Sequence, residues 1–258
     1  MRERIGTALI TGARRGIGRA IALALAGGGY DVALNDLFDG DEIRAVSAEA
    51  EKLGAKTVVV AGDIGDLGGH AAILDQAEKA LGPPTTLVNN AGVSVQSRGD
   101  LLDVSIESYD RCLDINTKAT FFLTQAFARR LLARERAAGL HHAIVTISSS
   151  NAVAISITRA EYCVSKAAAS MVSKLFAARL SDDGIGVYEV RPGFIETDMT
   201  APSKAMYDKR IADGLTVIKR FGQPEEVGRI VLTLASGLLP YTVGHVVEAD
   251  AGLLSIRY

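Results

Sequence analysis

The chain has 258 residues, of which 48% are hydrophobic and 5% aromatic, and its formal net charge is −2. Without a basic or acidic block, it gives no reason to expect a nucleic acid or an anionic membrane surface as a partner. No apolar run approaches the roughly 20 residues of a membrane-spanning helix, and the first residues lack the organisation of a signal peptide. We therefore expect a cytoplasmic protein with a single α/β domain over residues 1–258.

Strand-like and helical patterns alternate along the whole chain. Strands are expected at 5–11, 31–36, 56–61, 86–89, 142–148, 185–190 and 244–248. Helices are expected at 17–28, 41–53, 66–81, 106–136, 160–181 and 224–236. This alternation predicts a Rossmann-type, doubly wound parallel sheet of about seven strands, flanked by helices on both faces. The excess of Ala, Val, Ile and Leu suits a sheet buried in this way.

The first predicted strand runs into a glycine-rich turn, TGARRGIG, which opens the first predicted helix. Glycine permits a tight turn and the close approach of a ligand, and the helix N-terminus offers free N–H groups to an anion. The spacing is G-x-x-x-G-x-G, so an ordinary turn is the alternative to a pyrophosphate site. The residues of this candidate dinucleotide site are Gly12, Arg14, Arg15, Gly16, Ile17 and Gly18.

Asp36 ends the second predicted strand, where a carboxylate can accept hydrogen bonds from an adenosine ribose. The alternative is a solvated turn residue in the acidic stretch NDLFDGDE. A carboxylate at the ribose opposes a 2′-phosphate, so we expect NAD(H) to be preferred. Arg15 could offset part of that repulsion, which leaves NADP(H) possible.

Tyr162 and Lys166 stand four positions apart in the helical run EYCVSKAAAS, so their side chains leave the same helix face. A free phenol has a pKa of about 10 and is a poor catalyst near neutrality. A neighbouring ammonium favours the phenolate, so such a pair can exchange a proton with a substrate oxygen. Two surface residues that share a helix face are the alternative.

Together these motifs resemble the short-chain dehydrogenase/reductase family over nearly the whole chain. The likeness rests on TGARRGIG, the run Asn89-Asn90-Ala91-Gly92, Asn116 in LDINTKA, Ser149 in VTISSSNA, the Tyr162–Lys166 pair, and RPGFIETDM. The stretch PGFIETDMT is similar to 3-oxoacyl-acyl-carrier-protein reductases. This resemblance implies an NAD(P)-dependent enzyme that transfers a hydride between a nicotinamide cofactor and a ketone or secondary alcohol.

The resemblance also implies roles for particular residues. The implied catalytic set is Asn116, Ser149, Tyr162 and Lys166, with Ser148 as the alternative to Ser149. Asp63 and Ile64 would contact adenine, Asn90 would lie beside the cofactor, and Ile195 and Thr197 would contact the nicotinamide. Lys166 would also reach the ribose hydroxyls, and Asn116 would hold a water. The irregular stretch 192–222 resembles the family's substrate lid. The four histidines lack metal-ligand spacing, so we expect no metal site.

Three functions stay open: a reductase of 3-oxoacyl thioesters, an NAD-dependent dehydrogenase of a small polyol, sugar or other secondary alcohol, and a non-catalytic dinucleotide-binding regulator. Acyl carrier protein is a possible partner for a basic patch of Arg129, Arg130, Arg134 and Arg136. The small-molecule pocket is expected to include Asn151, Val153, Ile155, Arg159 and Glu161. Apolar faces on the helices at 106–136 and 160–181 predict a homotetramer.

Overall fold

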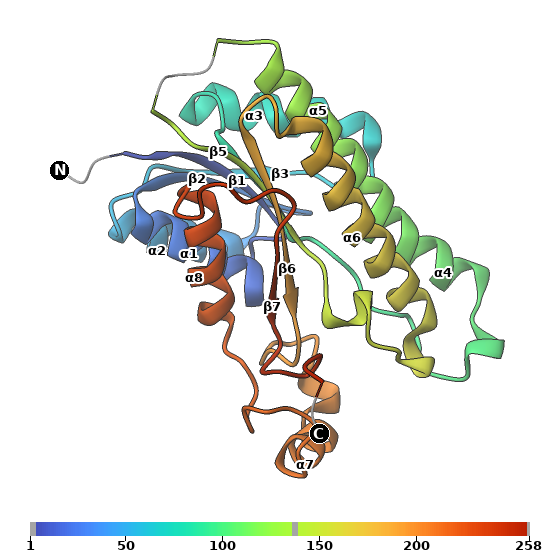
Figure 1. The fold of residues 1–258 in the computed structure, drawn as a ribbon. Helices are drawn as coiled ribbons and strands as arrows, with labels where there is room; N and C mark the ends of the chain where they lie inside the picture. Colours follow the sequence, from blue (N-terminus) through green and yellow to red (C-terminus); the bar gives the residue numbers. More distant parts are fainter. Residues whose placement is uncertain (1–3, 136–138, 257–258) are drawn as a thin grey trace.

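Seven parallel strands form a single sheet in the computed structural model, which describes residues 4–135 and 139–256 (Figure 1). The strands are β1 (Gly6–Thr11), β2 (Tyr30–Asp36), β3 (Thr57–Ala61), β4 (Thr86–Asn89), β5 (His142–Ile147), β6 (Ile185–Pro192) and β7 (Val246–Ala249). Their spatial order is β3-β2-β1-β4-β5-β6-β7, and every neighbouring pair is parallel. The predicted Rossmann-type fold is confirmed.

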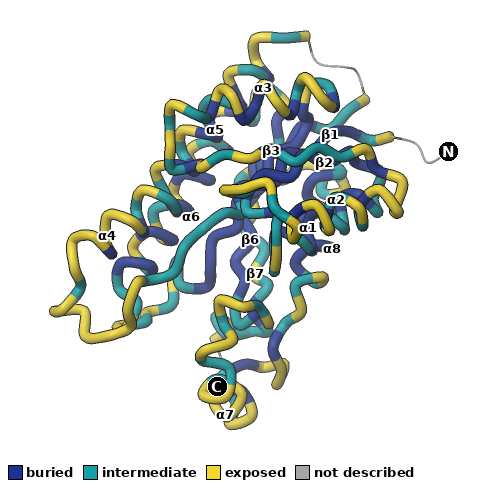
Figure 2. Tube along the Cα trace, turned by 180° about the vertical axis from the view of Figure 1, so that it is seen from behind, coloured by how far each residue is buried: buried dark blue, intermediate teal, exposed yellow. Residues whose placement is uncertain are grey.

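Helices cover both faces of this sheet. One apolar core joins the strands to α1 (Gly16–Gly28), α2 (Asp41–Lys52) and α8 (Pro224–Ala235). A second core joins the opposite face to α3 (His70–Leu81), α5 (Thr120–Leu132) and α6 (Ala160–Leu180), and α4 (Ile106–Leu113) packs against α6. In Figure 2 the strands between the two layers are largely dark blue, the colour of buried residues. Both faces of the strands are therefore removed from water, as the near-continuous apolar runs predict.

The helix predicted over 106–136 is not continuous. A π-helical segment, Asp114–Ala119, separates α4 from α5, which ends at Leu132. Residue 136 lies outside the described residues. π-Helical turns inside α-helices are frequent at functional sites, and this one contains Asn116, a predicted catalytic residue.

The stretch 192–222 is more regular than its sequence indicates, because it contains α7 (Lys204–Ala212) after a short 3₁₀ turn at Ala201–Ser203. Its two ends are joined by a β-bridge between Ile195 and Gly222. The Gly222 N–H donates to the Phe194 carbonyl at 2.8 Å. The segment is thus a loop closed at its base. No helix in the described part of the chain is long and apolar enough to cross a membrane.

The order of the strands determines where a ligand-binding crevice can form. β1 lies between β2 and β4, so the chain leaves β1 in one direction and, after β3, returns to its other side. The loops after β1 and β4 consequently diverge at the carboxyl ends of these strands. Open α/β sheets bind ligands in the crevice at this switch point.

Candidate active site

A cleft of about 910 Å³ opens at the carboxyl ends of the strands. Its walls come from the turns after β1, β2, β3, β4 and β5, from the start of α6, and from the segment 192–222. Every residue that we predicted to bind the cofactor lines this cleft: Gly12, Arg14, Arg15, Gly16, Ile17, Gly18, Asp36, Asp63, Ile64, Asn90, Tyr162, Lys166, Ile195 and Thr197. Residues spread from position 12 to position 197 thus meet in one place.

The glycine turn between β1 and α1 has the shape of an anion cradle. Gly12 and Gly16 have φ values of 65° and 54°, in the left-handed region that favours glycine. A Cβ on Gly18 would lie 2.0 Å from the Gly12 carbonyl oxygen. The Asn90 amide donates to the Thr11 and Gly12 carbonyls at 2.8 and 3.0 Å and holds the turn in place. The side chain of the N-cap residue, Arg15, makes no hydrogen bond to the first turn of α1, which leaves the N–H groups of that turn available for a pyrophosphate.

Asp36 lies at the end of β2, and its carboxylate lines the cleft. The carboxylate accepts hydrogen bonds from the Leu37 N–H at 2.9 Å and the Arg14 N–H at 3.3 Å. The basic side chain beside it is Arg14, whose Nε lies 3.6 Å from Oδ1. Arg15, which we expected to influence the choice of cofactor, instead pairs with Asp198 at 3.1 Å. Arg14 is therefore the nearer counter-charge at the predicted ribose position.

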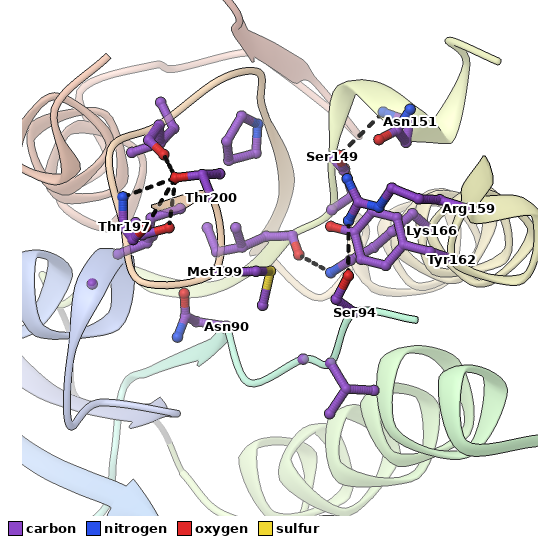
Figure 3. Close-up of a pocket in the computed structure, with 18 of the residues that line it drawn as sticks. Asn90, Ser94, Ser149, Asn151, Arg159, Tyr162, Lys166, Thr197, Met199 and Thr200 are labelled. Carbon is purple, nitrogen blue, oxygen red and sulfur yellow. Dashed lines mark hydrogen bonds between the residues drawn. The ribbon is translucent and has the colours of Figure 1, made fainter. Parts of the chain in front are cut away.

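Tyr162 and Lys166 face the cleft from one side of α6 (Figure 3). Both are buried, with exposed fractions of 7% and 5%. Lys166 Nζ donates to the Ile147 carbonyl at 3.0 Å and lies 5.7 Å from the centroid of the Tyr162 ring. Across residues 4–135 and 139–256, the Tyr162 hydroxyl has no protein hydrogen-bond partner within standard distance. This hydroxyl can therefore meet a ligand.

Ser148 and Ser149 follow β5, and their hydroxyls form different hydrogen bonds. Ser148 Oγ donates to the Glu189 carboxylate at 2.5 Å, inside a buried network that also holds Arg191. Ser149 Oγ accepts from the Asn151 N–H at 3.1 Å, so its own hydrogen is free to donate into the cleft. The geometry favours Ser149 as the donor to a substrate oxygen.

Asn116 lies behind the cleft rather than in its wall. Its amide nitrogen donates to the Val93 carbonyl at 3.0 Å and to Ser165 Oγ at 2.9 Å, and its Oδ1 accepts from the Val93 N–H at 2.8 Å. A Cβ on Gly92 would approach Asn116 Oδ1 to 3.0 Å and Lys166 Nζ to 3.4 Å. Asn116 thus holds the loop after β4 close to Lys166. Its predicted role in holding a water stays a prediction.

The substrate half of the cleft differs from the sequence-based expectation in two places. Glu161 is buried and accepts from Ser108 Oγ at 2.6 Å, outside the cleft wall, and Val153 is exposed outside it. Asn151, Ile155 and Arg159 do line the cleft. Residues that we did not predict join them: Ser94, Arg98, Arg111, Phe194, Met199, Tyr207 and Arg210. Phe194 and Met199 belong to the RPGFIETDM motif, and Tyr207 and Arg210 to the predicted lid. No motif marks Ser94, Arg98 or Arg111, because their location at the cleft depends on packing.

The doubly wound sheet, the glycine cradle at its switch point and the Tyr–Lys pair define a dinucleotide-dependent oxidoreductase. Residues 12–254 match the family model described as enoyl-(acyl carrier protein) reductase, and the chain belongs to the short-chain dehydrogenase/reductase family. It is therefore an NAD(P)-dependent oxidoreductase that acts on a ketone or secondary alcohol. Within the described ranges, no group of three or more His, Cys, Asp or Glu side chains could hold a metal ion.

Relatives of known structure or sequence cover almost the whole chain. The crystal structure of a 3-oxoacyl-acyl-carrier-protein reductase from Brucella melitensis in complex with NAD is 40% identical, covers 100% of both chains and superimposes with a TM-score of 0.95. A 3-oxoacyl-acyl-carrier-protein reductase from Staphylococcus aureus is 32% identical over 96% of this chain and 97% of its own length. A 2-dehydro-3-deoxy-D-gluconate 5-dehydrogenase from Dickeya dadantii is 30% identical over 96% of this chain and 95% of its own.

Proposed function

We propose that this chain reduces a ketone with NADH, or oxidises the matching alcohol with NAD, at the hydroxyl of Tyr162. One observation carries the proposal: Tyr162 and Lys166 share one cleft with the glycine cradle and Asp36. When bound, the nicotinamide cofactor supplies or accepts the hydride. In ketone reduction Tyr162 donates its proton to the developing alkoxide, and in alcohol oxidation it removes that proton.

Two neighbours support the tyrosine. Lys166, anchored to the Ile147 carbonyl, keeps its ammonium beside the phenol ring, and there it favours the negative form that arises when the proton leaves. Ser149 donates a hydrogen bond to the substrate oxygen, which orients the carbonyl and stabilises the oxyanion. The hydroxyl of Ser148 is occupied by Glu189, so it contributes to the wall and not to this donation.

The direct test removes the hydroxyl of Tyr162. Tyr162→Phe should lower turnover by at least about a hundredfold, since a general acid is lost, while the Kd for NADH changes little. Lys166→Ala should weaken both turnover and cofactor binding, because Lys166 also reaches toward the ribose. Tyr109→Phe, an exposed tyrosine on α4 outside the cleft, is the matched control. Near-normal rates for Tyr162→Phe would refute the assignment, and absence of any oxidoreduction by the wild type would favour a non-catalytic regulator.

NAD(H) is the proposed cofactor, with NADP(H) as the weaker one. Support comes from the carboxylate of Asp36 at the end of β2, because it can accept hydrogen bonds from the 2′- and 3′-hydroxyls and opposes a phosphate there. The Brucella melitensis reductase, whose structure holds NAD, agrees with this preference.

For the substrate, the named relatives support two candidates. The reductases from Brucella melitensis and Staphylococcus aureus favour a 3-oxoacyl thioester, and the Dickeya dadantii enzyme favours a sugar-derived substrate. Acyl carrier protein is a possible partner, but the basic patch on α5 is partly neutralised. Arg130 pairs with Asp75 at 2.7 Å and Arg134 with Glu78 at 3.0 Å, while Arg136 lies outside the described residues. The arginines that line the substrate half of the cleft, among them Arg159, favour the second candidate.

We also propose a homotetramer in the cytoplasm. The outer faces of α5 and α6 expose apolar side chains, among them Phe122, Met171 and Leu175, which are 40%, 54% and 55% exposed. Helices that are apolar on more than one face favour further partners. The two cysteines, Cys112 and Cys163, are free thiols, as is usual in a reducing compartment.

A further inference from the structure

The substrate half of the cleft has several positively charged side chains that form no ion pair within the described ranges. Four arginines line it: Arg98, Arg111, Arg159 and Arg210. Within residues 4–135 and 139–256, no carboxylate lies within 4.0 Å of any of these four guanidinium groups. The acidic residues of the cleft wall are elsewhere: Asp36 ends β2, Asp63 follows β3, and Asp198 lies beside Arg15. In the cofactor half, Arg14 and Arg15 lie beside Asp36 and Asp198, whereas the four arginines of the substrate half have no such carboxylate partner among the described residues.

Arg159 is the arginine nearest to the chemistry. It directly precedes α6, and its guanidinium carbon lies 4.1 Å from the centroid of the Tyr162 ring (Figure 3). Its Nη2 donates to Ser94 Oγ at 3.3 Å. Its Nε is buried and has no hydrogen-bond partner among the residues that the structure describes. A half-buried guanidinium thus has only an aromatic face and one neutral hydroxyl as partners, although a charge removed from water normally needs an ionic one.

The other arginines extend this charge outward from Tyr162. Arg111, at the end of α4, donates to the Ser94 carbonyl at 3.0 Å, so it converges on the same loop as Arg159. Arg98, Arg111 and Arg210 are all exposed at the wall. An exposed arginine alone is usually just solvated, so the inference rests on Arg159, which is half-buried. Glu161, two positions further along, forms no ion pair with Arg159 in the described part of the chain, and its Oε1 accepts from Ser108 Oγ outside the cleft wall.

We propose that the substrate carries an anionic oxygen group, a carboxylate or a phosphate, close to the reacting carbon, and that Arg159 binds this group. Arg111 contributes further positive charge on the same side. Guanidinium groups bind both kinds of anion through paired hydrogen bonds. Neither a neutral polyol nor a 3-oxoacyl thioester has a charge beside its reacting carbon, so neither would satisfy Arg159. The inference rests on the proposed function for one point, namely that the reacting carbon lies at Tyr162.

The test uses two pairs of ketones whose members differ in charge: acetoacetate with acetoacetamide, and dihydroxyacetone phosphate with dihydroxyacetone. With NADH, the wild type should favour the charged member of one pair by about tenfold or more in kcat/KM, and the pair that shows this distinguishes carboxylate from phosphate. Arg159→Gln should abolish this preference by lowering kcat/KM for the charged member and not for the neutral one. Arg159→Lys should retain part of the preference. Arg229→Gln, an exposed arginine on α8 outside the cleft, is the matched control and should change nothing.

Two results would overturn the inference. One is a wild type that treats both members of both pairs alike. The other is an Arg159→Gln variant that loses activity equally on charged and neutral ketones, which would make Arg159 a positioning residue for Tyr162.

Calorimetry on the Tyr162→Phe variant with NADH bound separates this inference from the proposed function, since binding needs no hydride transfer. Acetoacetate or dihydroxyacetone phosphate should bind, and the added Arg159→Gln substitution should abolish binding. If they bind in this way but the wild type reduces no ketone, the proposed function fails and the anion site stands. If ketones are reduced and neither anion binds, the anion site alone fails.

Discussion

The carboxylate of Asp36 should decide between the two nicotinamide cofactors, and Asp36→Asn isolates its charge. The amide keeps the shape of the side chain and an oxygen that can accept from the Leu37 N–H, which lies 2.9 Å from the carboxylate. A 2′-phosphate placed at the ribose position would lie against this carboxylate. Removing the charge should therefore improve NADPH binding much more than it affects NADH binding.

The size of the penalty on NADPH binding follows from two opposing effects, repulsion of the phosphate by Asp36 and its attraction by Arg14. Two like unit charges about 4 Å apart repel by about 4 kcal/mol at an effective dielectric of 20. The Arg14 Nε, 3.6 Å from Asp36 Oδ1, offsets part of this repulsion, although the Arg14 Nη1 also pairs with Glu42 at 2.7 Å, and solvent screening reduces the repulsion further. We expect a net penalty of about 1.4 kcal/mol, equal to about a tenfold shift in the ratio of the two Kd values. Arg15 should matter less, because it pairs with Asp198.

The assay is a fluorescence titration of NADH and NADPH against the wild type, Asp36→Asn and a control, Asp39→Asn. Asp39 has a carboxylate three positions further along, but it binds Arg44 at 2.8 Å and does not line the cleft. The control should leave the ratio of Kd values as in the wild type. If the wild type binds NADPH more tightly, or if Asp36→Asn leaves the ratio unchanged, Asp36 is a turn residue and the arginines of the glycine turn set the choice.

Two further predictions concern assembly and stability. Sedimentation of the wild type at micromolar concentration should give a tetramer, and Met171→Asp on the exposed face of α6 should dissociate it; a monomeric wild type would contradict the proposal. A hydrogen bond from Arg220 and one from the Gln223 N–H lower the pKa of Glu226 from 4.5 to about 2. Because the pKa of Glu226 is lower in the folded protein than in the unfolded chain, its carboxylate stabilises the fold fully at a pH above the unfolded pKa. This stabilisation is lost as the pH falls from about 4.5 toward 2. The Tm of Glu226→Gln should therefore lie below that of the wild type at pH 7, and this difference in Tm should disappear as the pH falls from about 4.5 toward 2. A difference in Tm, measured by calorimetry, that does not vary with pH would contradict this role of the Glu226 carboxylate.

The sequence by itself determined the features that depend on local order. The strand–helix alternation predicted the parallel sheet, because apolar periodicity is set by neighbours along the chain. The glycine turn was predictable for the same reason, since glycine adopts the positive φ values seen at Gly12 and Gly16 without the steric cost of a side chain. The four-residue spacing of Tyr162 and Lys166 placed them on one helix face, as α6 shows.

Only the tertiary structure decided which residues from distant segments meet. Spacing could not exclude Ser148 as the donor to the substrate oxygen, but in the structure its hydroxyl donates to Glu189 on the neighbouring strand. Likewise, the sequence pointed to Arg15 beside the ribose, whereas the turn directs Arg14 to Asp36. The contact of Arg159 with the Tyr162 ring, and the absence of a carboxylate partner for this arginine among the described residues, depend on how α6, α4 and the loop after β4 pack together. Such contacts leave no periodic trace in the chain, because they are distances between segments and not between neighbours.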